Sequence, residues 1–107
     1  MRELVFKVNG QSLEKDPECS FDGLIAGSSN YLSCRIIFED HEYDNLEKII
    51  EFITRDNSEF FQIKEESINI PSWVTAKAYF KVRIHGVDLK KKTEIVTNTI
   101  YIQQEVG

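Results

Sequence analysis

The chain has 107 residues, a mass of 12.5 kDa and a formal net charge of −5 at pH 7, and 41% of its residues are hydrophobic. Seven Phe, four Tyr and one Trp exclude a disordered chain, and the few Gly and Pro residues exclude a collagenous or low-complexity one. This length predicts one domain, residues 1–107, with a single hydrophobic core.

The sequence has no apolar stretch near the roughly 18 residues that a membrane-spanning helix needs. Residues 1–7 include an acidic residue and lack the apolar region of about seven residues that a secretory signal has. We therefore expect a reducing cytoplasm, in which Cys19 and Cys34 are free thiols and Cys34 packs in the core. A disulfide between the two is the alternative.

Alternating apolar and polar residues, which are typical of half-buried strands, begin at the N-terminus. Residues 4–8 form the first predicted strand, which ends at the turn dipeptide Asn9-Gly10. Residues 11–30 are polar and rich in turn formers, with room for one short strand at 24–25. Residues 31–38 form the second clear strand, and its apolar face consists of Leu32, Cys34, Ile36 and Phe38.

Residues 44–54 support two interpretations. Apolar residues at i, i+3, i+4 and i+7 from Leu46 form a helical stripe, and Asp44 with Glu47 resembles a capping box. These features predict a short helix near 45–54. The β-branched isoleucines of the same segment favour a strand, which would form a hairpin with a strand at 59–63.

The clearest strand lies in the C-terminal half, where residues 76–85 have one apolar face and one polar, basic face. A short strand at 67–70 precedes it, residues 86–92 are the predicted turn, and residues 93–104 form a closing strand. Together these elements predict an all-β fold. We expect an antiparallel β-sandwich of about seven strands, with a β-barrel as the alternative.

Acidic residues gather in the middle of the chain, where residues 39–76 hold ten acids and three bases. The densest part is the loop after the second strand. An acidic surface of this kind suits a basic protein partner. The candidate contacts in this loop are Asp40, Glu42, Tyr43 and Asp44.

The same loop partly matches a calcium-binding pattern, because Asp40, Glu42, Asp44 and Glu51 fall at positions 1, 3, 5 and 12 of the count. The sharp turn of such a site needs Gly where Asn45 stands. We therefore predict an exposed acidic loop without a metal, and leave open whether a cation binds residues 39–51.

No arrangement of residues indicates catalysis. His41 lies in the acidic loop and His85 on a polar strand face, where solvated side chains are expected, and Cys34 is on a core face. The Cys and His spacings do not fit a zinc site. We therefore predict no enzymatic activity, cofactor or metal. Trp73, in the turn after Pro71, is a candidate partner contact, or it closes one end of the sandwich.

Three segments resemble a known pattern: residues 68–74 (INIPSWV), 80–86 (FKVRIHG) and 95–98 (IVTN). They match an I-P-x-x-V turn, an F-x-V-x-V-x-G strand and a T-N strand, and the earlier part of the chain fits the same layout. The chain is similar to the immunoglobulin-like module at the N-terminus of phage upper-baseplate proteins, whose pattern has Trp where Tyr43 stands here. The resemblance implies an immunoglobulin-like β-sandwich, with a strand at 47–54, that binds protein neighbours in a virion and catalyses nothing.

The leading hypothesis is therefore a non-enzymatic phage or prophage protein, a tail or baseplate structural or adaptor domain, located in the host cytoplasm or the virion. The alternative is a small acidic inhibitor of a nucleic-acid-binding host defence protein. A third is a carbohydrate-binding sandwich that uses Trp73, Tyr79 or Tyr101 as stacking platforms. Direct binding to nucleic acid is not expected, because the only basic run is 90–92. A second copy of the chain is a further candidate partner.

Overall fold

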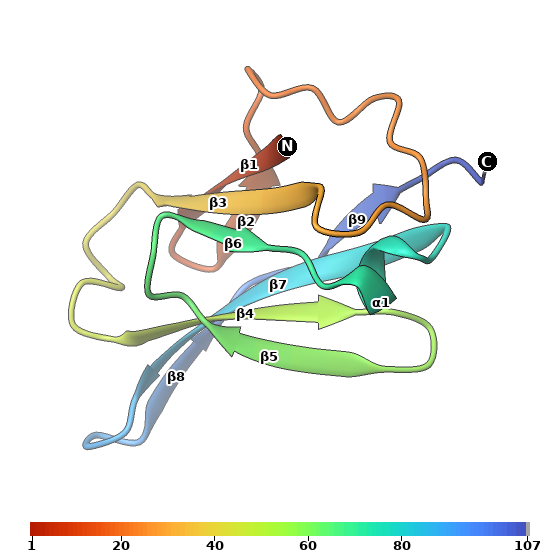
Figure 1. Ribbon diagram of the computed structural model, residues 1–107. Coiled ribbons are helices and arrows are strands. Elements are labelled where there is room, and N and C mark those ends of the chain that lie inside the picture. Colours follow the sequence, from red (N-terminus) through yellow and green to blue (C-terminus); the bar gives the residue numbers. More distant parts are fainter. Residues whose placement is uncertain (107) are drawn as a thin grey trace.

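The computed structural model describes residues 1–106, which form two β-sheets packed face to face (Figure 1). The all-β sandwich predicted from the sequence is confirmed, with nine strands in the described part of the chain instead of about seven. The strands are β1 (Arg2–Asn9), β2 (Ser12–Lys15), β3 (Leu32–Phe38), β4 (Glu47–Ile53), β5 (Ser58–Gln62), β6 (Ser67–Asn69), β7 (Tyr79–Asp88), β8 (Thr93–Val96) and β9 (Ile100–Gln103). One short helix, α1 (Ser72–Thr75), lies between β6 and β7.

The first sheet has the strand order β2-β1-β3-β6. Strands β1 and β3 are parallel, with Leu4 opposite Cys34, whereas the other pairs in this sheet are antiparallel. This pair departs from the antiparallel arrangement expected from the sequence. The reason is the long connection after β2: it returns to the start of β1, where the Arg2 amide donates to the Tyr31 carbonyl at 2.8 Å, so β3 runs in the direction of β1.

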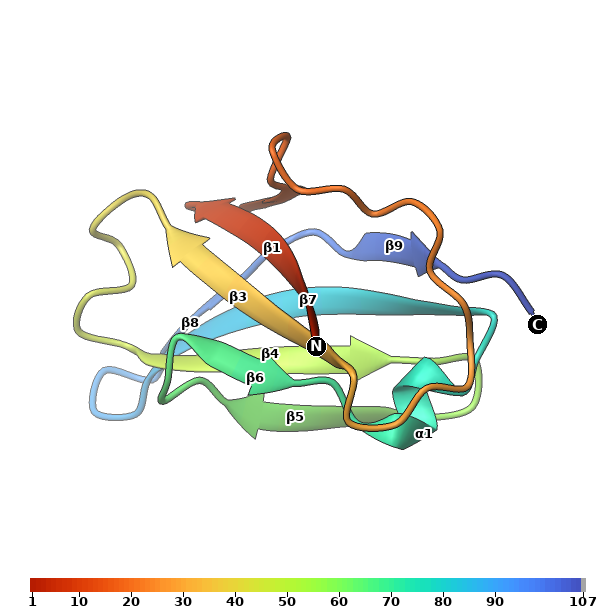
Figure 2. The same ribbon diagram turned by 45° about the horizontal axis from the view of Figure 1, so that its top comes forward.

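The second sheet has the order β5-β4-β7, and both β8 and β9 pair with the far edge of β7 (Figure 2). The predicted alternation in β7 is confirmed, since Phe80, Val82 and Ile84 are fully buried. The strand continues to Asp88, past the turn expected from Gly86 onward.

Residues 93–104 were expected to form one strand, but they form two. At Thr97 the hydroxyl oxygen accepts a hydrogen bond from the Ile84 amide at 3.0 Å, replacing a backbone partner. The next residue, Asn98, turns away and bonds to β2, where its side-chain amide pairs with both backbone groups of Leu13. The break therefore joins the two sheets.

The helix predicted near 45–54 is absent, and this interpretation of the helical stripe is wrong. Strand β4 occupies most of that segment, as the family resemblance implied. It pairs with β5 on one side and β7 on the other, so both edges of its backbone are satisfied while Ile50 and Phe52 enter the core. The short strand expected at 24–25 is a single bridge from Ile25 to Glu105.

The core fills the space between the sheets, with apolar side chains from β1 and β3 facing those of β4 and β7. Tyr43, from the β3–β4 loop, closes one end of it. Its ring is buried, with its centroid 5.0 Å from that of the Phe38 ring, and its hydroxyl donates to the Gly10 carbonyl at 2.7 Å. Helix α1 and the C-terminal segment lie at the opposite end (Figures 1 and 2).

Candidate functional site

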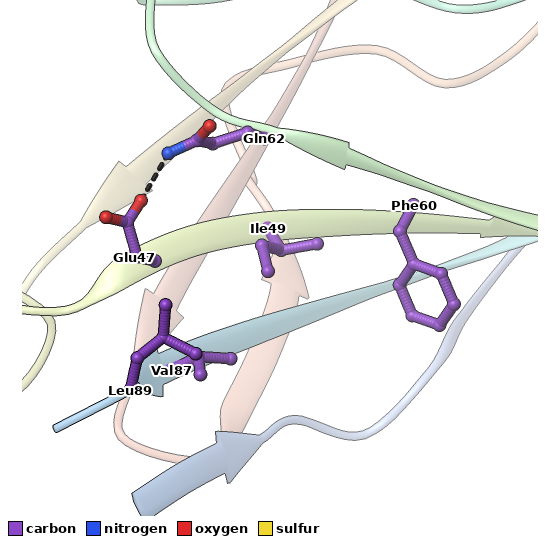
Figure 3. Close-up of a pocket in the computed structure, with 6 residues that line it drawn as sticks. All are labelled: Glu47, Ile49, Phe60, Gln62, Val87 and Leu89. Carbon is purple, nitrogen blue, oxygen red and sulfur yellow. Dashed lines mark hydrogen bonds between the residues drawn. The ribbon is translucent and has the colours of Figure 1, made fainter. Parts of the chain in front are cut away.

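The outer face of the second sheet carries an open groove of about 480 Å³ (Figure 3). Two of its side chains are conspicuously exposed for apolar residues, Phe60 at 56% and Leu89 at 76%. An exposed apolar patch with a polar margin is typical of an interaction surface. The groove is lined by Glu47, Ile49, Phe60, Gln62, Val87 and Leu89.

Strand pairing brings these side chains together from three strands. Ile49 on β4 lies directly opposite Gln62 on β5, and Glu47 lies opposite Val87 on β7. Because side chains alternate across a strand, these positions point outward while Ile50 points into the core. The Gln62 amide donates to the Glu47 carboxylate, which fixes the polar end of the groove. The groove floor is therefore made of paired strands.

A cluster of ionisable side chains lies beside the groove on the same face. Glu51 is only 4% exposed, and its Oε1 accepts hydrogen bonds from Arg83 Nη2 and His85 Nε2, both at 2.8 Å. The other ring nitrogen, His85 Nδ1, lies 3.0 Å from Glu94 Oε1. This carboxylate–histidine cluster (Glu51, Arg83, His85 and Glu94) joins β4, β7 and β8.

The cluster has a defined charge arrangement. Burial raises the pKa of Glu51, but hydrogen bonds from His85 and Arg83, with the charges of both, outweigh burial and hold the pKa below its usual value. Ionised carboxylate oxygens only accept hydrogen bonds, so Glu51 is the acceptor for both Arg83 and His85.

His85 was expected to be solvated, and that prediction is wrong. It is buried because the ring of Phe60 packs against it, with ring centroids 5.4 Å apart, and because Glu51 and Glu94 flank its nitrogens. His41 is the solvated one: its side chain is 97% exposed and contacts Asp44 at 2.9 Å.

The thiols are free, as predicted. Cys34 lies in the core, where burial raises its pKa to about 12, with a smaller contribution from the charge of Glu3. The structure thus places Cys34 between the sheets and His85 on an outer face, so the thiol and this imidazole are not brought together for nucleophilic chemistry.

The predicted partner contacts in the acidic loop divide into two groups. Glu42 and Asp44 are exposed, whereas Asp40 is partly buried and accepts a hydrogen bond from the Gly10 amide at 2.6 Å. Tyr43 is in the core, so its side chain offers no surface to a partner, and that choice is corrected. Burial, and then the charges of Asp40 and Glu42, raise the pKa of Tyr43 to about 12.

The calcium pattern does not converge on one point. Glu51, its last position, is held by Arg83 and His85 in the cluster on the outer face, instead of joining the loop carboxylates. Within residues 1–106, no group of three or more His, Cys, Asp or Glu side chains is arranged to hold a metal ion.

Trp73 lies on α1 and is half-buried against the core, at the end of the sandwich opposite Tyr43. The other two proposed stacking platforms, Tyr79 and Tyr101, stack on each other with centroids 5.1 Å apart. Tyr101 remains 48% exposed, and carbohydrate binding by these rings stays a prediction.

The groove was not predicted from the sequence. The available signal was apolar residues at outward positions of neighbouring strands, Ile49 and Phe60, together with Leu89 in a polar turn. In a single sequence these residues look like irregularities in the alternation of apolar and polar side chains. They become a surface only when the register of β4, β5 and β7 is known.

In the described range 1–106, no helix is long and apolar enough to cross a membrane. Comparison of the chain with models of known protein families, with curated proteins and with solved structures finds no match.

Proposed function

We propose that this chain is a non-enzymatic protein-binding module that serves as a structural or adaptor domain of a phage tail or baseplate. The observation that supports it best is the apolar groove on the outer face of the β5-β4-β7 sheet. Phe60 and Leu89 expose apolar area that water solvates poorly, and burying such area is the main driving force of protein association. The sequence resemblance supports the phage setting.

The occupant of the groove is a segment of a neighbouring virion protein with apolar side chains. The groove has an aliphatic surface formed by Ile49, Val87 and Leu89, and Phe60 adds an aromatic surface. At the other side, Glu47 can accept hydrogen bonds from polar groups of the segment, and Gln62 can donate to them or accept from them. The paired strands beneath keep the ordering cost of binding low.

The test uses particles purified from cells that express the tagged chain. We expect the chain in the particles, and we expect Leu89→Asp to reduce its incorporation at least tenfold, because a charge would be buried on binding. The matched control is Ile25→Asp, which changes another exposed aliphatic residue, 54% exposed, located near α1 at the other end. Particles without the chain, or equal incorporation of the two variants, would contradict the proposal.

A second candidate function is inhibition of a basic host defence protein. The observation that favours it is the exposed carboxylates of Glu42, Asp44 and Glu47, which lie at one end of the sandwich. Such binding weakens as salt rises, because the charges are solvent-exposed and screened. Reversing Glu42 and Asp44 to Lys should abolish it while Leu89→Asp leaves it intact; the opposite pattern supports the groove.

A further inference from the structure

Strand β5 forms a free edge of the second sheet (Figure 1). Among the described residues its one strand partner is β4, in a regular register from Ile49 opposite Gln62 to Ile53 opposite Ser58. The strand is exposed along most of its length, and it carries two adjacent aromatic residues, Phe60 and Phe61. A free edge exposes unpaired backbone donors and acceptors to any strand that can align with them.

The hydrogen-bond pattern identifies which backbone groups are free. The Ile63 amide donates to the Lys48 carbonyl and the Thr54 amide to the Asn57 carbonyl, both at 2.8 Å. Hydrogen-bonded residues alternate along an antiparallel pair, so Phe61 and Glu59 between them also bond to β4. The backbone groups of Ser58, Phe60 and Gln62 therefore point away from the sheet.

This edge has few of the features that block strand pairing, and the one that it keeps is the charged side chain of Glu59 on its core-facing side, opposite Phe52. The edge strands β2, β6, β8 and β9 have only three or four residues, whereas β5 has five. Within residues 58–62 there is no Pro, Gly or Lys, and the register contains no bulge. Short length, Pro, Lys and bulges are the usual protections of an exposed edge.

We propose that two copies of this chain pair through their β5 edges, antiparallel and around a two-fold axis at Phe60. This register sets Phe60 against Phe60 of the second copy and Ser58 against its Gln62. Every outward-facing backbone group is then used, which gives about six inter-chain hydrogen bonds. One symmetric contact produces a closed dimer, with the two second sheets joined into one.

Charge complementarity at both ends favours a second copy over an unrelated strand. The same register extends to place Asp56, the turn residue next to Asn57, near Lys64 of the second copy, and the two-fold axis repeats this pair at the other end. Both side chains are exposed. Within one chain, Asp56 and Lys64 are at opposite ends of β5, roughly 25 Å apart, beyond the screening length of about 8 Å at physiological salt. Their interaction is therefore inter-chain.

The dimer can be tested separately from the proposed groove partner. Asp56 and Lys64 do not line the groove, so changing them tests self-pairing alone. Phe60 and Gln62 belong to both features, and pairing would bring the two grooves side by side on one continuous face. A single strand pair buries little area, so the dimer is weak.

The test is the molar mass of the purified chain by light scattering and sedimentation, from about 10 μM to about 1 mM. We expect the mass to rise from 12.5 kDa toward twice that value. Asp56→Lys and Lys64→Asp should each weaken dimerisation about three- to tenfold, because like charges then face each other. The double variant should restore it to within about twofold, because the reversed pairs attract again.

Phe60→Lys should also abolish the dimer, since it sets two lysines directly opposite each other. Tyr101→Lys, which changes an exposed aromatic residue on β9, is the matched control and should leave the dimer unchanged. A monomeric mass at every concentration overturns the proposal. So does a double charge variant that is as weak as the single ones.

Discussion

The ring of Tyr43 lies directly on the backbone of Gly86. A Cβ at Gly86 would stand 2.7 Å from Tyr43 Cδ2 and 2.9 Å from a methyl carbon of Leu46, closer than real contacts allow. The glycine near the end of β7 is thus required by a side chain from the β3–β4 loop, 43 positions earlier in the sequence. This contact closes the loop end of the core.

Gly86→Ala should therefore destabilise the fold by about 1–3 kcal/mol through overpacking. Tyr43→Phe should cost only about 1 kcal/mol, the net value of its hydrogen bond to Gly10. In a Tyr43→Leu background the cost of Gly86→Ala should fall, because the ring atoms that the methyl group would meet are gone. Urea unfolding of the wild type, the single variants Gly86→Ala and Tyr43→Leu, and their double variant measures this coupling. Strictly additive effects would contradict the contact.

The carboxylate–histidine cluster predicts acid sensitivity. The pKa of Glu51 in the folded chain lies below its ordinary value of 4.5, so the unfolded chain takes up this proton first as the pH falls. The stabilisation is fully present above about pH 4.5 and is lost as the pH drops through the lower folded value. Glu51→Gln should cost about 1.5–3 kcal/mol at pH 7, and this difference should shrink on acidification.

Glu94→Gln is the control for the cluster. The Glu94 side chain is half exposed, so its loss should cost about 1 kcal/mol or less. Unfolding free energies measured from pH 7 to pH 3 for the two variants and the wild type make the comparison. Equal curves for Glu51→Gln and the wild type would mean that Glu51 is not held as described.

Asn98 joins the two sheets through its side chain. Its Oδ1 accepts from the Leu13 amide at 2.7 Å and its Nδ2 donates to the Leu13 carbonyl at 3.0 Å, so the side chain acts as a strand partner for β2. Asn98→Ala should destabilise the fold by about 1–3 kcal/mol, because the backbone amide and carbonyl of the buried Leu13 both lose their partner. The exposed neighbour Thr99→Ala should change stability by less than about 0.5 kcal/mol, and equal effects in thermal unfolding would contradict this role.

The two thiols should differ sharply in reactivity. The thiolate is the reactive form, and a pKa of about 12 leaves Cys34 almost entirely protonated and buried at pH 8. Cys19 is partly exposed and should be alkylated first. Mass spectrometry after iodoacetamide treatment should find one modification in the folded chain and two in denaturant; similar rates at both cysteines in the folded chain would contradict the prediction.

The strands whose outer faces are polar could be predicted from the sequence, and β7 is the example. Strand β4 was ambiguous because Ile49 and Ile53 are apolar on the outer face, so the strand looked like a helical stripe. The contacts of His85 with Phe60 and Glu51, and the parallel pairing of β1 with β3, join residues 25 or more positions apart, which local periodicity does not report.

The candidate site was predicted less well than the fold. Tyr43 was chosen as a contact because it lies in an acidic loop, yet its ring enters the core, and no local pattern indicates which side of a loop a Tyr takes. The groove depends on the register of three strands, and Leu89 joins it only through the bend after β7.

The most direct test of the groove as the working surface is site-specific photo-crosslinking in assembling particles. A photoreactive amino acid in place of Leu89 should crosslink to one tail or baseplate protein, with the contact peptide identified by mass spectrometry. The same group in place of Ile25, near α1, should give no such product. Crosslinks to that protein from position 25 and none from position 89 would contradict the account.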